Sequence, residues 1–121
     1  MIVFDSHAWI EYFMGSDKGK HVRTYVDGQE EIATPAVCLA EIKHKYMCDG
    51  REFDSRLQFI MTRSKVANLT KEIALLAAEK KKEYKLYMVD ALVYAAGIYL
   101  GAHVLSGDGH FRHLPEVEFL E

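Results

Sequence analysis

Short apolar runs alternate with segments of helical length along the whole chain. The runs at residues 1–4, 31–34, 66–69, 103–106 and 117–120 are too short for helices, and each predicts a strand. Strands that alternate with helices are joined by crossover connections, which produce a parallel sheet covered by helices. The alternation therefore predicts an α/β fold in three layers, with a central parallel sheet of four to five short strands and helices on both faces.

Capping residues predict where the helices begin and end. Ser6 and Gly15 are expected to bound the first helix. Thr34 is expected to cap a later helix, with Pro35 at its first position, where the missing N–H is not needed. Thr70 is expected to cap a long helix after the third strand. The other helices are expected over residues 20–26, 53–63 and 86–101.

Length and composition predict one soluble domain, residues 1–121. Half of the residues are hydrophobic, which suffices for one core. The net charge of −3 argues against a broad basic surface, so nucleic-acid binding would be local or carried by metal ions. Cys38 and Cys48 lie about 15 Å apart in one expected helix, too far for a disulfide. With free thiols, no signal peptide and no uncharged span of about 20 apolar residues, we expect a cytoplasmic protein without membrane contact.

The most hydrophobic segment, residues 86–102, holds a single charged residue, Asp90. As a helix N-cap, its carboxylate would accept hydrogen bonds from free backbone N–H groups. Alternatively, the carboxylate is held there to bind a ligand. The segment alone leaves both interpretations open.

Four acidic residues occupy positions from which they could converge. Asp5 ends the first expected strand, and Asp108 follows the fourth. Glu41 and Asp90 lie near the starts of helices, and Glu41 belongs to the helical stripe of Val37, which is expected to face inward. In open α/β sheets, ligands bind at the carboxyl ends of the strands, beside the following helix N-termini. Because clustered carboxylates repel one another, the pattern indicates a divalent cation, and an all-oxygen donor set favours Mg²⁺ or Mn²⁺.

Each acid also has a structural explanation. Asp5 could cap the following helix, and Asp108 could support a turn between glycines. Glu41 could pair with Lys45 one turn on, or its stripe could be exposed. One shared metal site explains all four positions together more simply than four separate structural roles.

Four motifs occur in order along nearly the whole chain: VFDSHAWIEYF, TPAVCLAEI, VDALVYAAG and VLSGDGHF. Together they resemble the PIN-domain ribonucleases, and within them the VapC-type toxins of prokaryotic toxin–antitoxin pairs. The resemblance implies a metal-binding and catalytic quartet that consists of Asp5, Glu41, Asp90 and Asp108. Ser106 matches a small hydroxyl residue of the family, and Ser6 and Ser106 are expected to lie directly behind the quartet as supporting residues. Where many members have a further acid, this chain has His110.

The resemblance further implies a magnesium- or manganese-dependent endoribonuclease that hydrolyses RNA phosphodiester bonds. A cognate antitoxin protein is the expected partner. A homodimer is also expected, with Trp9, Tyr12 and Phe13 as exposed aromatic residues near the N-terminus. The lysines of residues 79–85 could contact the RNA backbone, although a solvated helix face is the simpler interpretation.

Other classes of function fit the sequence less well. Glu41 and His44 have the Glu-x-x-His spacing of di-iron bundles, but the required second copy is missing. The histidines form no recognised zinc pattern with the cysteines. The alternative that remains is a degenerate, non-catalytic domain of the same fold that binds RNA or a protein, and the presence of all four acids argues against it.

Overall fold

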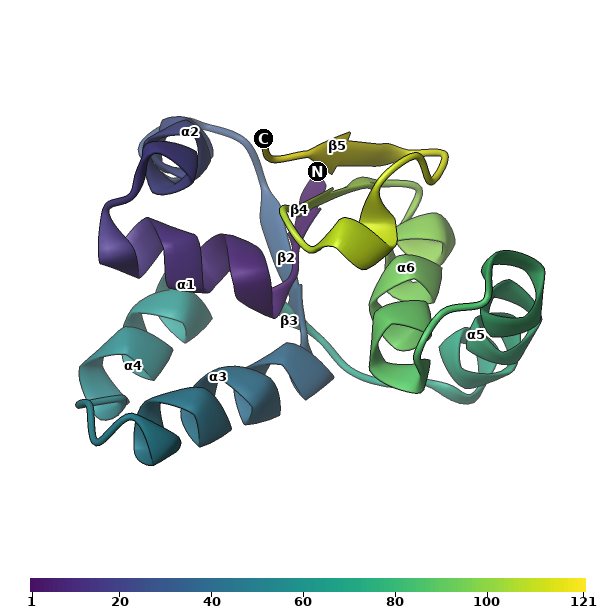
Figure 1. Cartoon of the computed structure of the whole chain (residues 1–121), viewed down its shortest axis with the longest axis horizontal. Coiled ribbons are helices and arrows are strands. Elements are labelled where there is room, and N and C mark those ends of the chain that lie inside the picture. Colours follow the sequence, from purple (N-terminus) through teal and green to yellow (C-terminus); the bar gives the residue numbers. More distant parts are fainter.

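Five short strands form one parallel sheet in the computed structural model, which describes residues 1–121 (Figure 1). The strand order is β3-β2-β1-β4-β5, and every neighbouring pair is parallel. The strands are β1 (Ile2–Phe4), β2 (Ile32–Pro35), β3 (Lys65–Ala67), β4 (His103–Ser106) and β5 (Val117–Phe119). All five predicted strands are confirmed, with shifts of one or two residues at their ends.

Six α-helices cover the two faces of the sheet. They are α1 (Ser6–Met14), α2 (Asp17–Val26), α3 (Ala36–Cys48), α4 (Asp54–Arg63), α5 (Lys71–Tyr84) and α6 (Met88–Leu100), and a short 3-10 turn, η1, spans Gly109–Phe111. Figure 1 shows α1 to α4 on one side of the sheet and α5 and α6 on the other. The predicted three-layer α/β architecture is confirmed.

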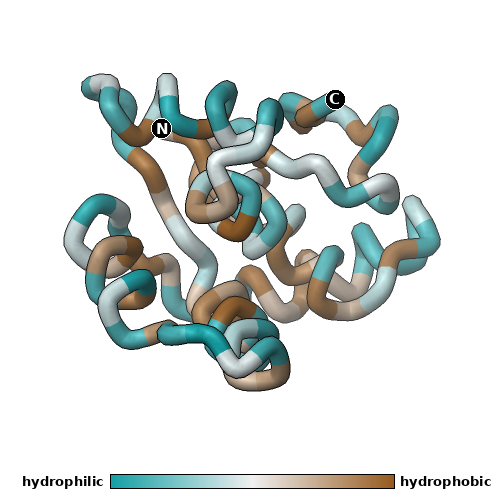
Figure 2. The backbone as a smooth tube through the Cα atoms, turned by 60° about the vertical axis from the view of Figure 1, so that its left-hand side comes forward, coloured by the Kyte–Doolittle hydropathy of each residue, from teal (hydrophilic) through white to brown (hydrophobic).

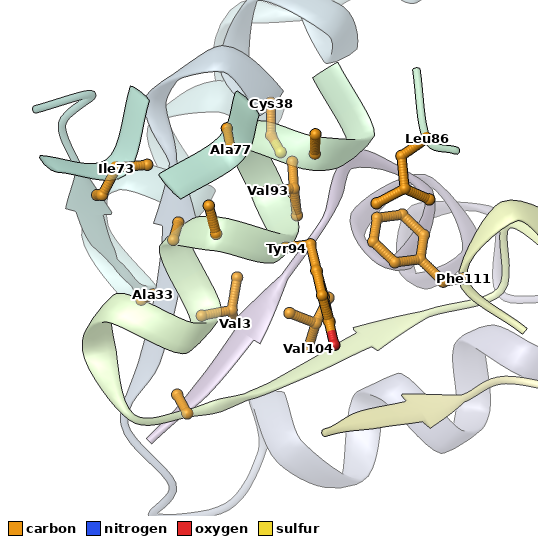
Figure 3. Close-up of a cluster of buried hydrophobic side chains, with 14 residues drawn as sticks. Val3, Ala33, Cys38, Ile73, Ala77, Leu86, Val93, Tyr94, Val104 and Phe111 are labelled. Atoms are coloured by element: carbon orange, nitrogen blue, oxygen red, sulfur yellow. The ribbon is translucent and has the colours of Figure 1, made fainter. Parts of the chain in front are cut away.

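The alternation of side chains along the strands divides the core into two parts. Ile2 and Phe4 of β1 pack against the layer of α1 to α4, whereas Val3 packs against α5 and α6. The same alternation occurs in β4, where Val104 and Leu105 point to opposite layers. Figure 3 shows the second part, in which side chains of α6 lie over the sheet. In Figure 2 the hydrophobic stretches run mainly through the middle of the fold, whereas the outer turns are mostly hydrophilic.

Two of the predicted helix caps are wrong. Asp5, rather than Ser6, caps α1 by accepting a hydrogen bond from the backbone N–H of Ala8. Thr34 does not cap α3, because its hydroxyl group is buried and accepts a hydrogen bond from the Trp9 indole. The predicted start of α2 is three residues late, since Ser16 caps it. The stop at Gly15 and the cap at Thr70 are confirmed.

The aromatic residues of α1 are not the exposed surface expected from the sequence. Trp9 is fully buried, with its ring 4.9 Å from that of Phe4. Tyr12 and Phe13 are half-buried and pack around Phe59 of α4. These aromatic rings pack helix α1 against helix α4. They therefore give no support to a homodimer, which stays a prediction.

Cys38 and Cys48 form no disulfide, as their spacing predicts. Cys38 is buried and Cys48 is exposed. None of the helices combines the length and the apolar character needed to cross a bilayer.

The packing of α6 against β4 leaves no room for a side chain at Gly97. A Cβ atom at this position would lie 2.6 Å from Cγ2 of the buried Val104 and 3.2 Å from the carbonyl oxygen of Ala102. Alanine at a helical position gains about 1 kcal/mol over glycine. Overpacking a rigid, buried valine costs about 1–3 kcal/mol, so the crowding outweighs this gain.

We therefore expect Gly97→Ala to lower the free energy of unfolding by about 1 kcal/mol, as measured by urea denaturation. Gly109→Ala is the matched control for stability, because a Cβ atom there would meet nothing within 4 Å. A Gly97→Ala variant as stable as the parent would contradict this account of the packing.

Candidate functional site

Two of the predicted acids lie beside the pair β1 and β4, at which the chain switches from one half of the sheet to the other. The chain leaves β1 toward β2 on one side, and β4 pairs with β1 on the other. Such a point leaves a crevice at the carboxyl ends of the two strands, where ligands bind in open α/β sheets. Asp5 follows β1 directly and Asp108 comes two residues after β4, so both lie at this edge.

Asp5 is buried, with 4% of its surface exposed, and both carboxylate oxygens accept hydrogen bonds. Oδ1 accepts from the backbone N–H of Ala8 at 2.8 Å, and Oδ2 accepts from the hydroxyl group of Ser106. The capping role therefore uses Oδ1 only, and Oδ2 is held by Ser106. The structural and the functional interpretation of Asp5 are compatible.

Ser106 connects Asp5 to Asp108. Its hydroxyl oxygen accepts a hydrogen bond of 3.0 Å from the backbone N–H of Asp108 while its proton is donated to Asp5. The Asp108 carboxylate in turn accepts from the backbone N–H of His110 at 2.9 Å and caps η1. The predicted turn role of Asp108 is thus real, and the same Oδ1 also lies 2.8 Å from Nδ1 of His110.

Asp90 is not the N-cap of α6. The cap position is Tyr87, and Asp90 is the third residue of the helix, where its side chain retains 17% exposure. Oδ2 of Asp90 lies 3.2 Å from Nδ1 of His110. The single carboxylate of the most hydrophobic segment therefore contacts the side chain of His110 in η1 and does not cap its own helix.

Glu41 lies on an exposed stripe of α3, not on the inward stripe predicted from Val37. The residues of α3 that enter the core are Cys38, Ile42 and Tyr46. Glu41 accepts a hydrogen bond of 3.1 Å from the Ser6 hydroxyl group at the start of α1. In Figure 1, α1 and α3 both begin near the middle of the molecule, which explains this contact between distant segments.

Lys45, the alternative partner of Glu41, instead pairs with Asp49 at 3.2 Å. The predicted ion pair that would have explained Glu41 structurally is therefore absent, and the only hydrogen-bond partner of the Glu41 carboxylate is Ser6.

The four carboxylates influence one another electrostatically. Burial raises the pKa of Asp5 to about 7, against the hydrogen bonds from Ser106 and Ala8, and the charges of Asp108 and Glu41 raise it further. Partial burial raises the pKa of Glu41, with a further contribution from Asp108. Partial burial also raises the pKa of Asp90, to which Asp108 and Glu41 contribute, although His110 opposes them. Asp108 thus acts on the pKa of each of the other three predicted acids.

The tightest group of potential metal donors contains Asp90, Asp108 and His110. One donor atom from each residue lies within 4.8 Å of the others, whereas Asp5 and Glu41 lie outside this group. Two carboxylates and an imidazole suit a divalent cation. His110 is absent from the predicted ligand set, and its position two residues after Asp108 is the signal that could have included it.

The comparisons with known proteins agree with this architecture. The model of the PIN domain family matches residues 2–117. A search of curated protein sequences finds no match. A solved toxin–antitoxin complex from Klebsiella pneumoniae is similar with a TM-score of 0.83 and 19% identity, over 100% of this chain and 98% of that chain.

Two further solved structures have the same fold. VapBC2 from Rickettsia felis, bound to a DNA fragment from its promoter, has a TM-score of 0.76 and 16% identity, over 100% of this chain and 98% of that chain. VapC20 from Mycobacterium tuberculosis, a toxin that cleaves the sarcin–ricin loop, has a TM-score of 0.76 and 18% identity, over 98% of this chain and 99% of that chain. At these identities the likeness concerns the fold, and the family follows from the match over nearly the whole sequence: the chain belongs to the PIN domain family.

Proposed function

We propose that this chain is a metal-dependent endoribonuclease and the toxin of a toxin–antitoxin pair, with residues 1–121 working as one nuclease domain. The observation that carries the proposal is the group of Asp90, Asp108 and His110, whose donor atoms lie within 4.8 Å of one another. Asp5 and Glu41 add two further carboxylates, whose pKa values are both raised in part by the charge of Asp108. Such a cluster is unfavourable without a cation, because like charges at short range oppose ionisation. A fold that keeps it there is best explained by a site that binds divalent ions.

The donors fit Mg²⁺ or Mn²⁺, which take carboxylate oxygens as ligands. When bound, a divalent ion would activate water as the nucleophile and polarise the phosphoryl group. Asp90 and Asp108 are the proposed inner ligands, since their oxygens belong to the tightest donor group. Asp5 and Glu41 complete the proposed catalytic quartet.

Two hydroxyl groups orient the outer carboxylates. Ser106 donates to Asp5 and thereby fixes the direction of its Oδ2. Ser6 donates to Glu41 and ties α3 to the start of α1. Because carboxylate ligands that are already oriented lose little rotational freedom on binding an ion, we assign both serines as positioning residues.

The proposed substrate and partner come from the structural relatives. One of them is a toxin that cleaves the sarcin–ricin loop, which supports RNA as the substrate. Others are toxin–antitoxin assemblies from Klebsiella pneumoniae and Rickettsia felis, which support an antitoxin protein as the partner. We also retain the homodimer as a proposal, to be tested by sedimentation.

The substitution Asp90→Asn tests the metal site. Asparagine keeps the shape of the side chain but loses the charge that attracts a hard cation. We expect the rate of Mg²⁺- or Mn²⁺-dependent cleavage of a structured RNA pool to fall at least about a hundredfold, since several kcal/mol of transition-state stabilisation depend on the ion. The metal-free melting temperature should stay level or rise, because a carboxylate whose pKa is raised by burial and by Asp108 is removed.

Asp54→Asn is the matched control, because Asp54 also lies in the first turn of a helix but is exposed. It should cleave RNA like the parent chain. Cleavage retained in Asp90→Asn would refute the proposed role of Asp90. Parent protein that binds RNA without any metal-dependent cleavage would favour the non-catalytic alternative.

The raised pKa of Asp5 predicts a dependence of metal-free stability on pH. The folded-state pKa is about 7, above the ordinary value of 3.8, so the folded chain binds the proton more tightly than the unfolded chain. The resulting stabilisation is fully present below pH 3.8 and is lost as the pH rises through 7. The slope should approach about 1.4 kcal/mol per pH unit within this window.

Asp5→Asn isolates this contribution, because asparagine cannot titrate and still accepts the Ala8 hydrogen bond. Urea denaturation in a chelator, from pH 4.5 to 8, should show the parent losing stability relative to the variant as the pH rises. Added Mn²⁺ should restore the parent more than the variant. Parallel stability curves for the two proteins would show that Asp5 is not held in an unfavourable charged state.

A further inference from the structure

We propose that His110 is a nitrogen ligand of the bound ion and that it makes the site prefer Mn²⁺ over Mg²⁺. This inference rests on the proposed metal-dependent function and concerns which ion the site selects. Its basis is the position of one imidazole nitrogen between two carboxylates.

Nδ1 of His110 lies 2.8 Å from Oδ1 of Asp108 and 3.2 Å from Oδ2 of Asp90. An octahedral ion that holds its ligands at about 2.1 Å places neighbouring ligand atoms about 3 Å apart. The two distances therefore match the spacing of adjacent ligands around one ion. The three donor atoms are therefore already spaced so that one ion could bind between them with little movement of the side chains.

The ring of His110 is held in this orientation by its surroundings. Its backbone N–H donates to Asp108, and the following residue, Phe111, is buried and anchors the η1 turn. The ring of Tyr87 packs against the imidazole edge to face, with centroids 5.0 Å apart and an interplanar angle of 83°. About half of the His110 side chain stays exposed, so the ring is accessible to an ion from solvent.

An ordinary surface histidine shows a simpler arrangement. Nε2 of His103, at the amino end of β4, lies 2.9 Å from one carboxylate, that of Glu116, and belongs to no cluster of potential metal donors. His110 differs because it faces two carboxylates that come from separate segments of the chain. His103 therefore serves as an internal comparison for the role of His110.

The chemistry of the donor decides which ion benefits. Mg²⁺ is a hard ion that binds oxygen ligands almost exclusively. The first-row transition ions accept imidazole nitrogen more readily, Mn²⁺ least among them but still more readily than Mg²⁺. A neutral imidazole in place of an acid adds a donor without adding a charge. Relative to an all-carboxylate site, the ligand set of Asp90, Asp108 and His110 should therefore favour Mn²⁺.

The direct test uses the full chain with Mn²⁺ as the only ion and pulsed electron paramagnetic resonance as the readout. A nitrogen ligand gives a ¹⁴N coupling to the bound Mn²⁺. We expect this coupling in the parent and in His103→Ala, and its loss in His110→Ala. Melting temperatures of the three proteins verify that each is folded.

Competition between Mn²⁺ and Mg²⁺ provides the second readout. His110→Ala should bind Mn²⁺ at least about tenfold more weakly, the size of effect produced even when only the partner of a ligand is removed. Its affinity for Mg²⁺ should change less. His110→Asp should shift the preference toward Mg²⁺, because it restores a charged oxygen donor.

The outcomes separate this inference from the proposed nuclease function. Bound Mn²⁺ without nitrogen coupling, or coupling that persists in His110→Ala, would overturn the role of His110 even if the parent cleaves RNA. A nitrogen coupling that depends on His110 in a protein without RNA cleavage would support the ligand and refute the nuclease. Failure of the parent to bind Mn²⁺ would overturn both.

Discussion

The buried carboxylate of Asp5 is the group on which the site and its surroundings depend. One oxygen caps α1 through Ala8, the other accepts from Ser106 at the end of β4, and the carboxylate lies where β1 and β4 separate. One side chain therefore caps the start of α1, joins the ends of β1 and β4, and places a carboxylate at this edge of the sheet. Since a buried carboxylate is unfavourable unless it is hydrogen-bonded or paired, these contacts make its position possible, and Ser106 also joins it to Asp108.

The packing of the two apolar parts of the core offsets the cost of the buried Asp5 carboxylate. Val3 and Phe4 precede Asp5 and enter opposite parts of the core, so the strand that carries the carboxylate is held from both faces. On α6, Ala91 and the residues from Val93 to Gly97 are buried, and this packing holds the first half of the helix in place. A fold with separate, well-packed layers can tolerate a destabilised edge, because stability and binding come from different residues.

The sequence predicts the features that depend on local pattern, and it fails where a distant segment decides. The strands, the parallel sheet and the edge positions of Asp5 and Asp108 follow from short apolar runs and from their order. The hydroxyl of Thr34 could cap a helix, but the indole of Trp9, 25 residues away, makes it part of the core instead. In α3, two stripes of similar spacing compete for the interior. The one with Ile42 is buried because α3 packs against α1, a contact that no local pattern in α3 contains.

His110 shows how one residue can change the balance between stability and binding at such an edge. A further acid at this position would add to the repulsion that already raises the pKa of Asp90. Histidine adds no negative charge at this position, and its interaction with Asp90 lowers the pKa of that carboxyl group, so the ion-free fold carries less unfavourable charge. The same exchange removes part of the electrostatic attraction that a hard ion needs, and supplies a nitrogen donor in its place. The replacement of a charged acid by a neutral donor between Asp90 and Asp108 would then have two effects. It would make the metal-free fold less unfavourable, and it would make the site prefer Mn²⁺ over Mg²⁺.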